Sequence, residues 1–292
     1  MNMMPADSFA AYILNGLVQA ACLFLLASGL TLIFGVLGIL NFAHAALFML
    51  AAYLAAQVSV WSGSFWVALF MVPPVLALVG AGLERGLLRR VYDVPVAYQL
   101  LLTLGVVLLI KDLIKLLWGT AWKTLSEPPM FSGTLMVLGR PYPMYNVVYI
   151  GFVILLGLAL WAFLNRTRTG KVVRAAAADR DMANAVGINV PLVYTGVCAL
   201  GTALAAIMGV FHGPMMNIHL DVDHHYIVEA FAVVVIGGLG SMRGALVGAL
   251  IVGILQAVAI STYPELEMVV IYLIVIGVLV LRPQGLFGEP AA

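Results

Sequence analysis

The chain has 292 residues, of which 64% are hydrophobic and 9% are charged, and its formal net charge is +1. Water-soluble proteins carry about 25% charged residues and about 45–50% apolar ones, so the polar surface that two soluble domains would need is missing. The near-neutral charge also excludes the basic field of a nucleic-acid-binding protein. We therefore expect an all-α, polytopic membrane protein in which residues 1–292 form a single transmembrane domain.

Apolar runs recur along the whole chain. At roughly 20 residues per membrane-spanning helix, they leave room for about eight to ten crossings, some of them broken or re-entrant. The first run is expected to be a retained span, because the first Lys or Arg is Arg85 and a cleavable signal peptide would begin with positive charge. Two of the runs, 226–238 and 268–281, are shorter than a full crossing requires. The runs cover residues 10–34, 43–60, 65–83, 96–118, 143–164, 191–211, 226–238, 244–262 and 268–281.

The basic residues indicate which connections face the cytoplasm. Cytoplasmic connections of membrane proteins are enriched in Lys and Arg. Most of the arginines lie in the connections at 84–93 and 165–190, and Arg282 follows the last apolar run. These segments are therefore predicted to be cytoplasmic.

The remaining connections are predicted to face outward. Residues 213–225 and 262–267 contain carboxylates but no Lys or Arg, and 119–142 should lie on the same side. Residues 226–262 must then enter the membrane and return, as a hairpin or a re-entrant pair. No charge marks the turn between the first two runs, so their orientation stays open.

A glycine-rich stretch at 236–244 predicts a break in a membrane helix. Glycine costs a helix about 1 kcal/mol relative to alanine. Broken backbone survives in a bilayer only where protein or a water-filled cavity satisfies its polar groups. Gly244 and Gly248 then share a bare helical face, for which close packing of another helix is the favoured interpretation. The residues of this stretch predicted to line a transport path are Gly237, Gly238, Gly240 and Ser241.

Residues 34–44 repeat the pattern of Gly-x-Leu-Gly, a polar residue and a small-residue helix. Asn41 is predicted to cap a helix that begins near Phe42. His44 lies in an apolar run, where a polar residue is a functional candidate, although an interhelical hydrogen bond is the favoured interpretation, as for Glu229. Two interrupted helices in separate parts of a membrane protein point to a transport path. Asn41 and His44 are therefore predicted to line it, where helix N-termini would suit a carboxylate.

The densest polar cluster of the sequence lies between two apolar runs on the outward side. Imidazoles and carboxylates together can bind a transition metal, so a metal-ion permease is one alternative function. The spacing matches no closed metal site, and a solvated outward loop is favoured. Cys22 and Cys198, far apart and without a CxxC motif, are expected to be packing residues. The cluster comprises His212, His219, Asp221, Asp223, His224 and His225.

The sequence contains no HExxH, GxSxG or Walker A motif. We therefore predict no enzyme activity and no cofactor, and any ATP that drives transport must be bound by another chain. The connection at 165–190 suits docking of such a chain, because its alanine-rich middle favours a helix and Gly187 can end that helix in the left-handed conformation. A stand-alone channel or carrier is the other alternative.

Taken together, these stretches resemble the LivH-type permeases of branched-chain amino acid ABC importers over nearly the whole chain. The resemblance implies a bacterial inner-membrane subunit that imports branched-chain amino acids or related small amino acids, organic acids or amides. Its implied partners are a second related permease, two cytoplasmic ATPases and a periplasmic substrate-binding protein. Ala45 departs from the family, which commonly has glycine there. The segments that carry the resemblance are residues 29–35, 40–44, 170–175, 187–189, 235–241 and 281–288.

The resemblance also gives the cytoplasmic connection a role. Its short helix looks like the permease segment that inserts into a cleft of the ATPase. The residues implied in this coupling are Arg174, Asp179, Ala183 and Gly187.

Overall fold

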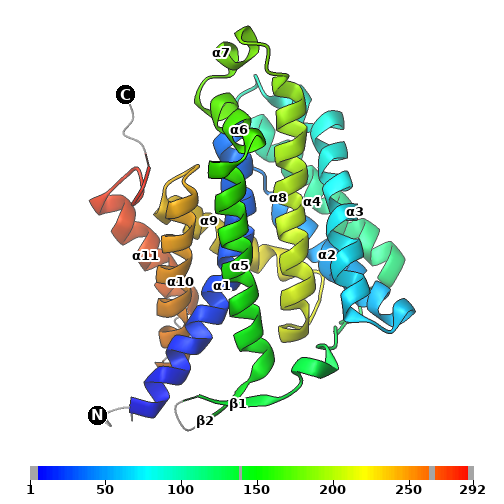
Figure 1. The fold of residues 1–292 in the computed structure, drawn as a ribbon, viewed down its shortest axis with the longest axis vertical. Coiled ribbons are helices and arrows are strands. Elements are labelled where there is room, and N and C mark those ends of the chain that lie inside the picture. Colours follow the sequence, from blue (N-terminus) through cyan, green and yellow to red (C-terminus); the bar gives the residue numbers. More distant parts are fainter. Residues whose placement is uncertain (1–5, 138–139, 263–266, 289–292) are drawn as a thin grey trace.

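The computed structural model describes residues 6–137, 140–262 and 267–288. Each predicted apolar run forms a helix, and together the helices make one bundle (Figure 1). Within these described residues, six helices are long and apolar enough to cross a membrane, namely α1, α2, α3, α5, α8 and α10. The bundle helices are α1 (Ala6–Leu37), α2 (Ala43–Ser62), α3 (Phe65–Gly86), α4 (Val96–Trp118), α5 (Met144–Arg166), α8 (Val190–His212), α9 (Val222–Gly237), α10 (Met242–Thr262) and α11 (Glu267–Leu281). The prediction of an all-α, polytopic bundle is confirmed.

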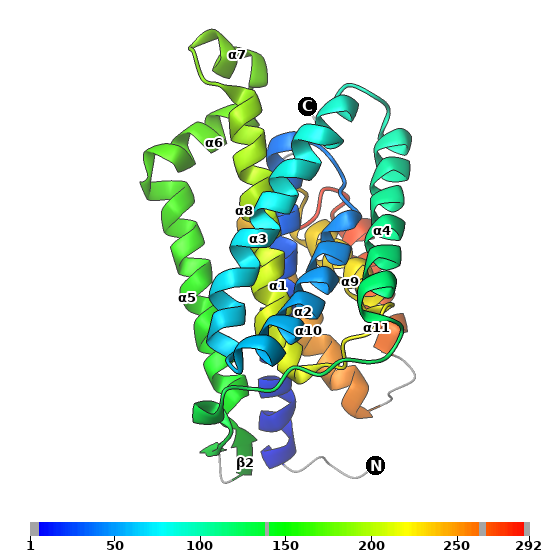
Figure 2. The same cartoon turned by 90° about the vertical axis from the view of Figure 1, so that its right-hand side faces the viewer.

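Successive helices of the bundle alternate in direction (Figures 1 and 2). α1 and α2 run in opposite directions, which settles the orientation that the sequence left open between them. α9 and α10 form the hairpin predicted for residues 226–262. α9 has 16 residues and α11 has 15, so both are shorter than the roughly 20 residues of a full crossing.

The two predicted cytoplasmic connections lie at the same end of the bundle, at the top of Figures 1 and 2. One holds the short helix η1 (Leu88–Val91), and the other holds α6 (Arg168–Ala178) and α7 (Arg180–Ala185). An ion pair of 3.3 Å between Arg180 and Asp93 joins them. This end carries most of the arginines, which is why we expect it to face the cytoplasm, and it is referred to below as the cytoplasmic end.

The outward end is closed by two connections that pair with each other. Lys123 and Ile218 exchange backbone hydrogen bonds of 2.9 Å, so residues 119–142 and 213–225 share one side, as predicted. The first connection contains η2 (Pro129–Phe131) and an antiparallel hairpin of β1 (Thr134–Val137) and β2 (Arg140–Pro143), and η3 (Gly213–Met215) begins the second. The predicted outward turn at 262–267 lies mostly outside the described residues.

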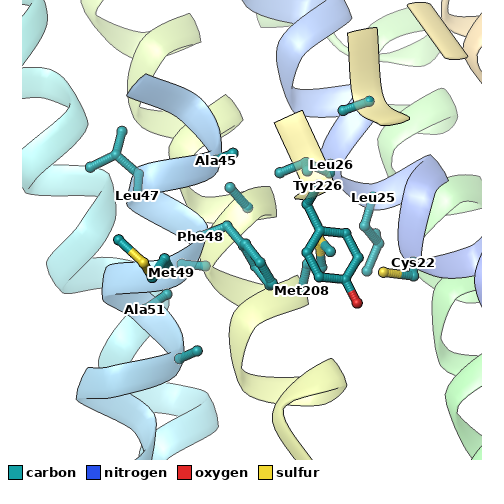
Figure 3. Close-up of a cluster of buried hydrophobic side chains, with 14 of the residues drawn as sticks. Cys22, Leu25, Leu26, Ala45, Leu47, Phe48, Met49, Ala51, Met208 and Tyr226 are labelled. Atoms are coloured by element: carbon teal, nitrogen blue, oxygen red, sulfur yellow. The ribbon is translucent and has the colours of Figure 1, made fainter. Parts of the chain in front are cut away.

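α1 and α2 form the centre of the bundle. The apolar windows of these helices are 89% and 78% buried, against 22% for α5. Figure 3 shows side chains of α1, α2, α8 and α9 meeting around Phe48, Met208 and Tyr226. Helices in lipid gain little from apolar contact alone and associate where small residues let their backbones approach. The alanines of α2 and the glycines of α1 and α8 meet this requirement.

Candidate transport path and coupling site

The structure brings the two glycine-rich breaks together near the cytoplasmic end. The first lies between α1 and α2, and the second between α9 and α10. A Cβ atom placed on Gly35 would lie 3.1 Å from the Cα atom of Gly240. Gly38 and Gly240 have φ angles of 71° and 83°, and both are exposed. The two breaks therefore meet in one junction, made by residues 38–42 and 238–241, which is exposed at Gly38, Leu239 and Gly240.

Asn41 lies one residue before the N-cap of α2, which is Phe42 rather than the predicted Asn41, but its side chain still contacts the start of the helix. Its Oδ1 atom accepts a hydrogen bond of 3.1 Å from the backbone N–H of Ala43, where the helix begins. Asn41 is itself buried, and the next residue, Phe42, stacks on Phe231 of α9 with ring centroids 4.8 Å apart. The capped break is thus packed against α9.

His44 is fully buried where α1, α2 and α8 meet. A Cβ atom on Gly29 would lie 2.7 Å from the Nε2 atom of His44 and 2.7 Å from the carbonyl oxygen of Gly201. The buried imidazole therefore occupies space that exists only because residue 29 is glycine. The favoured interpretation was an interhelical hydrogen bond. The Leu26 backbone of α1 lies close to the imidazole, as that interpretation requires, although neither ring nitrogen has a partner at full hydrogen-bond geometry within the described part of the chain.

Gly237 and Gly238 are buried beneath the C-terminal segment. The backbone N–H groups of Leu286 and Phe287 donate to the carbonyl oxygens of Ile236 and Gly237, at 2.8 and 2.9 Å. The broken end of α9 is therefore satisfied by protein, one of the two ways in which such a break survives in a bilayer. The terminal motif at 281–288 is visible in the sequence. That it donates hydrogen bonds to the last carbonyl groups of α9 is visible only in the structure.

The bare face of α10 packs against α9, as the favoured interpretation held. A Cβ atom on Gly244 would lie 2.1 Å from the Gly237 carbonyl oxygen, and one on Gly248 would lie 2.6 Å from that of Val233. The Ser241 Oγ atom accepts a hydrogen bond of 3.1 Å from Gly244 N–H at the start of the helix. These contacts fix the α9–α10 hairpin.

The outward polar cluster does not converge on one point. Among the described residues, no group of three or more His, Cys, Asp or Glu side chains could hold a metal ion. Asp223 pairs with Lys111 of α4 at 2.9 Å, and the His212 ring lies 2.8 Å from the Tyr226 hydroxyl. His219 instead contacts the backbone of its own loop. Cys22 and Cys198 are free and buried, as expected of packing residues.

Glu229 makes the interhelical hydrogen bonds that the sequence favoured, within a buried network whose partners the sequence did not name. Its side chain is 1% exposed and accepts hydrogen bonds from Gln256 of α10 at 2.6 Å and Gln19 of α1 at 3.3 Å. The His225 ring approaches the same carboxylate at 3.2 Å. Gln19 and Gln256, which lie within apolar runs, are the sequence feature that points to this network. A polar residue in a membrane span needs a partner.

The cytoplasmic connection forms two helices that meet at Asp179. The extended backbone of Asp179 ends α6, and its Oδ1 atom accepts a hydrogen bond of 2.9 Å from Met182 N–H at the start of α7. Gly187, with a φ angle of 86°, follows the end of α7, as predicted. Both ends of α7 are therefore fixed locally.

Two other predicted coupling residues contact the helix bundle of this chain. Ala183 is buried in an apolar cluster with Leu88 and Val190. Arg174 donates hydrogen bonds to the Leu164 carbonyl and the Asn165 side chain, at the end of α5. Met182 and Val186 are instead the exposed apolar residues in and directly after α7, and no motif in the sequence marks them.

The described residues also enclose two apolar grooves. One, of about 570 Å³, lies between α1, α5 and α10, and the other, of about 420 Å³, lies between α3, α5 and α8. None of the predicted path residues lines either groove. The junction of the two breaks therefore remains the candidate path element within this chain.

Comparison with known proteins places this architecture in a family. A family model described as "Branched-chain amino acid transport system / permease component" matches residues 12–279. The chain belongs to this family. It is therefore a transporter subunit rather than an enzyme, and a multi-pass protein of the inner membrane, as the sequence predicted.

Individual relatives of the permease span nearly its whole length. The LivH permease of Escherichia coli K12, for high-affinity branched-chain amino acid transport, is 29% identical over 97% of this chain and 96% of its own. The BraD permease of Pseudomonas aeruginosa is 28% identical over 95% of each chain. The ribose import permease RbsC of Haemophilus influenzae is 26% identical over 88% of this permease and 80% of its own length.

Proposed function

We propose that this permease forms one half of the membrane pathway of an ATP-driven importer. Its cargo is a branched-chain amino acid or a related small amino acid, organic acid or amide. A second, related permease supplies the other half, a periplasmic binding protein delivers the cargo, and two cytoplasmic ATPases drive the cycle. Similarity to LivH and BraD along the whole chain supports the cargo class.

The position of α7 is the observation that carries this proposal. The helix stands beyond the bundle at its cytoplasmic end (Figure 2). Met182 of this helix is 61% exposed, and Val186, the residue directly after its end, is 68% exposed, while Ala183 is buried on its other side. An apolar pair on a rigid, protruding helix suits insertion into a groove of a partner protein. We therefore assign ATPase docking to this face of α7, with Asp179 and Gly187 holding the helix in shape.

The junction of the two breaks is proposed to form the cytoplasmic end of the pathway. Gly38, Leu239 and Gly240 are exposed there, whereas Asn41 and Gly237 are buried behind them. We propose that Gly240 and Ser241 contact the cargo as it leaves. Asn41, His44, Gly237 and Gly238 set the shape of the junction from within the fold.

Replacement of Met182 by Glu tests the docking assignment. A charge placed in an apolar groove should lower the amount of ATPase that co-purifies with tagged permease by about tenfold or more, as expected for a central interface residue. Val186→Glu should act in the same way. Asp181→Asn, at a side chain that is 95% exposed on the same helix, is the matched control and should retain the ATPase.

Two results would refute the proposal. One is normal ATPase capture by both Glu variants. The other is accumulation of leucine by the permease alone in vesicles, without ATPase or nucleotide, which would indicate a stand-alone carrier.

A further inference from the structure

A carboxylate is buried at the cytoplasmic end of α3, close to α7. The Glu84 side chain is 0% exposed. Its Oε1 atom accepts hydrogen bonds from Arg89 Nε at 3.1 Å and from the Tyr92 hydroxyl at 2.5 Å. Its Oε2 atom accepts from Arg89 Nη2 at 3.0 Å and from the Thr195 hydroxyl at 2.5 Å. Both oxygens of the carboxylate are thus fully used, as a buried charge requires.

These four residues, Glu84, Arg89, Tyr92 and Thr195, are referred to as the clamp. They join segments that are distant in sequence, since Glu84 and Thr195 are 111 residues apart. Arg89 Nη2 also donates to the Pro191 carbonyl at 3.2 Å, in the first turn of α8. The guanidinium therefore fastens the end of α3 to the start of α8, in the forked geometry that arginine alone provides.

The clamp is connected to α7 by three separate routes. Residues 186–189 are the whole link between α7 and α8. Arg180, the first residue of α7, pairs with Asp93, which directly follows Tyr92. Ala183 packs in the same apolar cluster as Leu88 of η1. A displacement of α7 is therefore passed both to α8 and to the α3–α4 connection.

Below the clamp, α3 and α8 have no room to slide past each other. A Cβ atom on Gly80 would lie 2.3 Å from Thr202 Oγ1 and 3.1 Å from the Cys198 carbonyl oxygen. The Tyr92 and Tyr194 rings pack edge to face with centroids 5.3 Å apart. Burial and the hydrogen bond to Glu84 raise the pKa of the Tyr92 hydroxyl above its ordinary value, so it remains a donor. Packed interiors of this kind move as units rather than deforming continuously.

We propose that the clamp positions α3 and α8 so that they follow α7 as one body, and that it converts ATPase motion at α7 into movement of the membrane helices. This inference rests on the proposed docking of an ATPase at α7. The clamp residues contact neither cargo nor nucleotide in this scheme. They determine how much transport each hydrolysed ATP produces.

The test uses the complete transporter in proteoliposomes and measures leucine molecules taken up per ATP hydrolysed. Arg89→Gln removes the guanidinium fork, and Thr195→Val removes the bridging hydroxyl while keeping the side-chain shape. Both variants should assemble with the ATPase and hydrolyse ATP, yet uptake per ATP should fall by roughly two- to thirtyfold, the range of network-mediated coupling. The matched control is Arg90→Gln, because Arg90 is exposed in the same short helix. It should keep the wild-type ratio.

An unchanged ratio of uptake to ATP hydrolysis in both clamp variants would overturn the proposal. If Arg89→Gln does not assemble, the isosteric Thr195→Val variant decides by the same ratio. Failure of the docking assignment gives a different signature, because it appears as normal ATPase capture by Met182→Glu. The two proposals can therefore fail separately.

Discussion

Replacing Glu229 by Leu should destabilise the permease through the buried network that joins α1, α9 and α10. The substitution removes the acceptor of the 2.6 Å bond from Gln256 and the 3.3 Å bond from Gln19. Interhelical hydrogen bonds in membranes contribute about 0.6 kcal/mol each on average and up to about 1.7 kcal/mol. Two lost bonds therefore lower the free energy of unfolding by about 1–3 kcal/mol. Glu229→Gln keeps one acceptor oxygen and should cost less than about 1 kcal/mol.

A double-variant cycle separates this network from simple loss of volume. Glu229→Leu combined with Gln256→Leu removes both partners of the shortest bond, and replacing both by apolar groups can be nearly neutral. The double variant should therefore be more stable than the sum of the single effects, by about 1–2 kcal/mol. The assay is unfolding of the purified permease by titration with denaturing detergent. Strictly additive effects, or equal stability of the Leu and Gln single variants, would refute the reasoning.

Two further predictions concern the junction and the α9–α10 hairpin. Leu239→Cys, at a side chain that is 47% exposed, should lose uptake after modification by a charged thiol reagent, whereas Val96→Cys, at the start of α4 and 51% exposed, should not. Full modification at 239 with normal uptake would exclude the junction from the path. Gly244→Ala places a methyl group 2.1 Å from the Gly237 carbonyl oxygen and should lower the free energy of unfolding by about 1–3 kcal/mol. Gly105→Ala, with nothing within 4 Å of the new atom, should leave stability unchanged or raise it by about 1 kcal/mol; equal effects at the two glycines would argue against close packing as the cause.

Local features of the sequence predicted the helices closely. The run at 96–118 became α4 (Val96–Trp118), and the short run at 268–281 became the short helix α11 (Glu267–Leu281). Such runs are readable because a lipid-embedded helix satisfies its own backbone and needs only sustained apolarity. Capping is equally local. Gly187 after α7 is predictable, and the N-cap of α2 is predictable to within one residue of Asn41, because these contacts involve neighbours within a few residues.

The direction in which a residue faces could not be predicted in the same way. Ala183 was assigned to the coupling surface, but it is buried against this chain, and Met182 beside it is exposed. In this six-residue helix, one residue is buried and its neighbour is exposed only because other parts of the fold pack against one side of the helix. The four-residue period of Gly244 and Gly248 did predict a packed face, because close approach of helices depends on small residues at that spacing.

The sequence by itself indicated the number and limits of the apolar helices, the end of the bundle to which the charged connections belong, and the family. These properties follow from composition and local order, which act within one helix and its flanks. Only the tertiary structure decided that residues 286 and 287 complete α9, and that Glu84 meets Thr195. Gln19 likewise reaches Glu229 across 210 residues. Contacts between residues so far apart depend on how the helices pack against each other. The local sequence around either residue does not predict them.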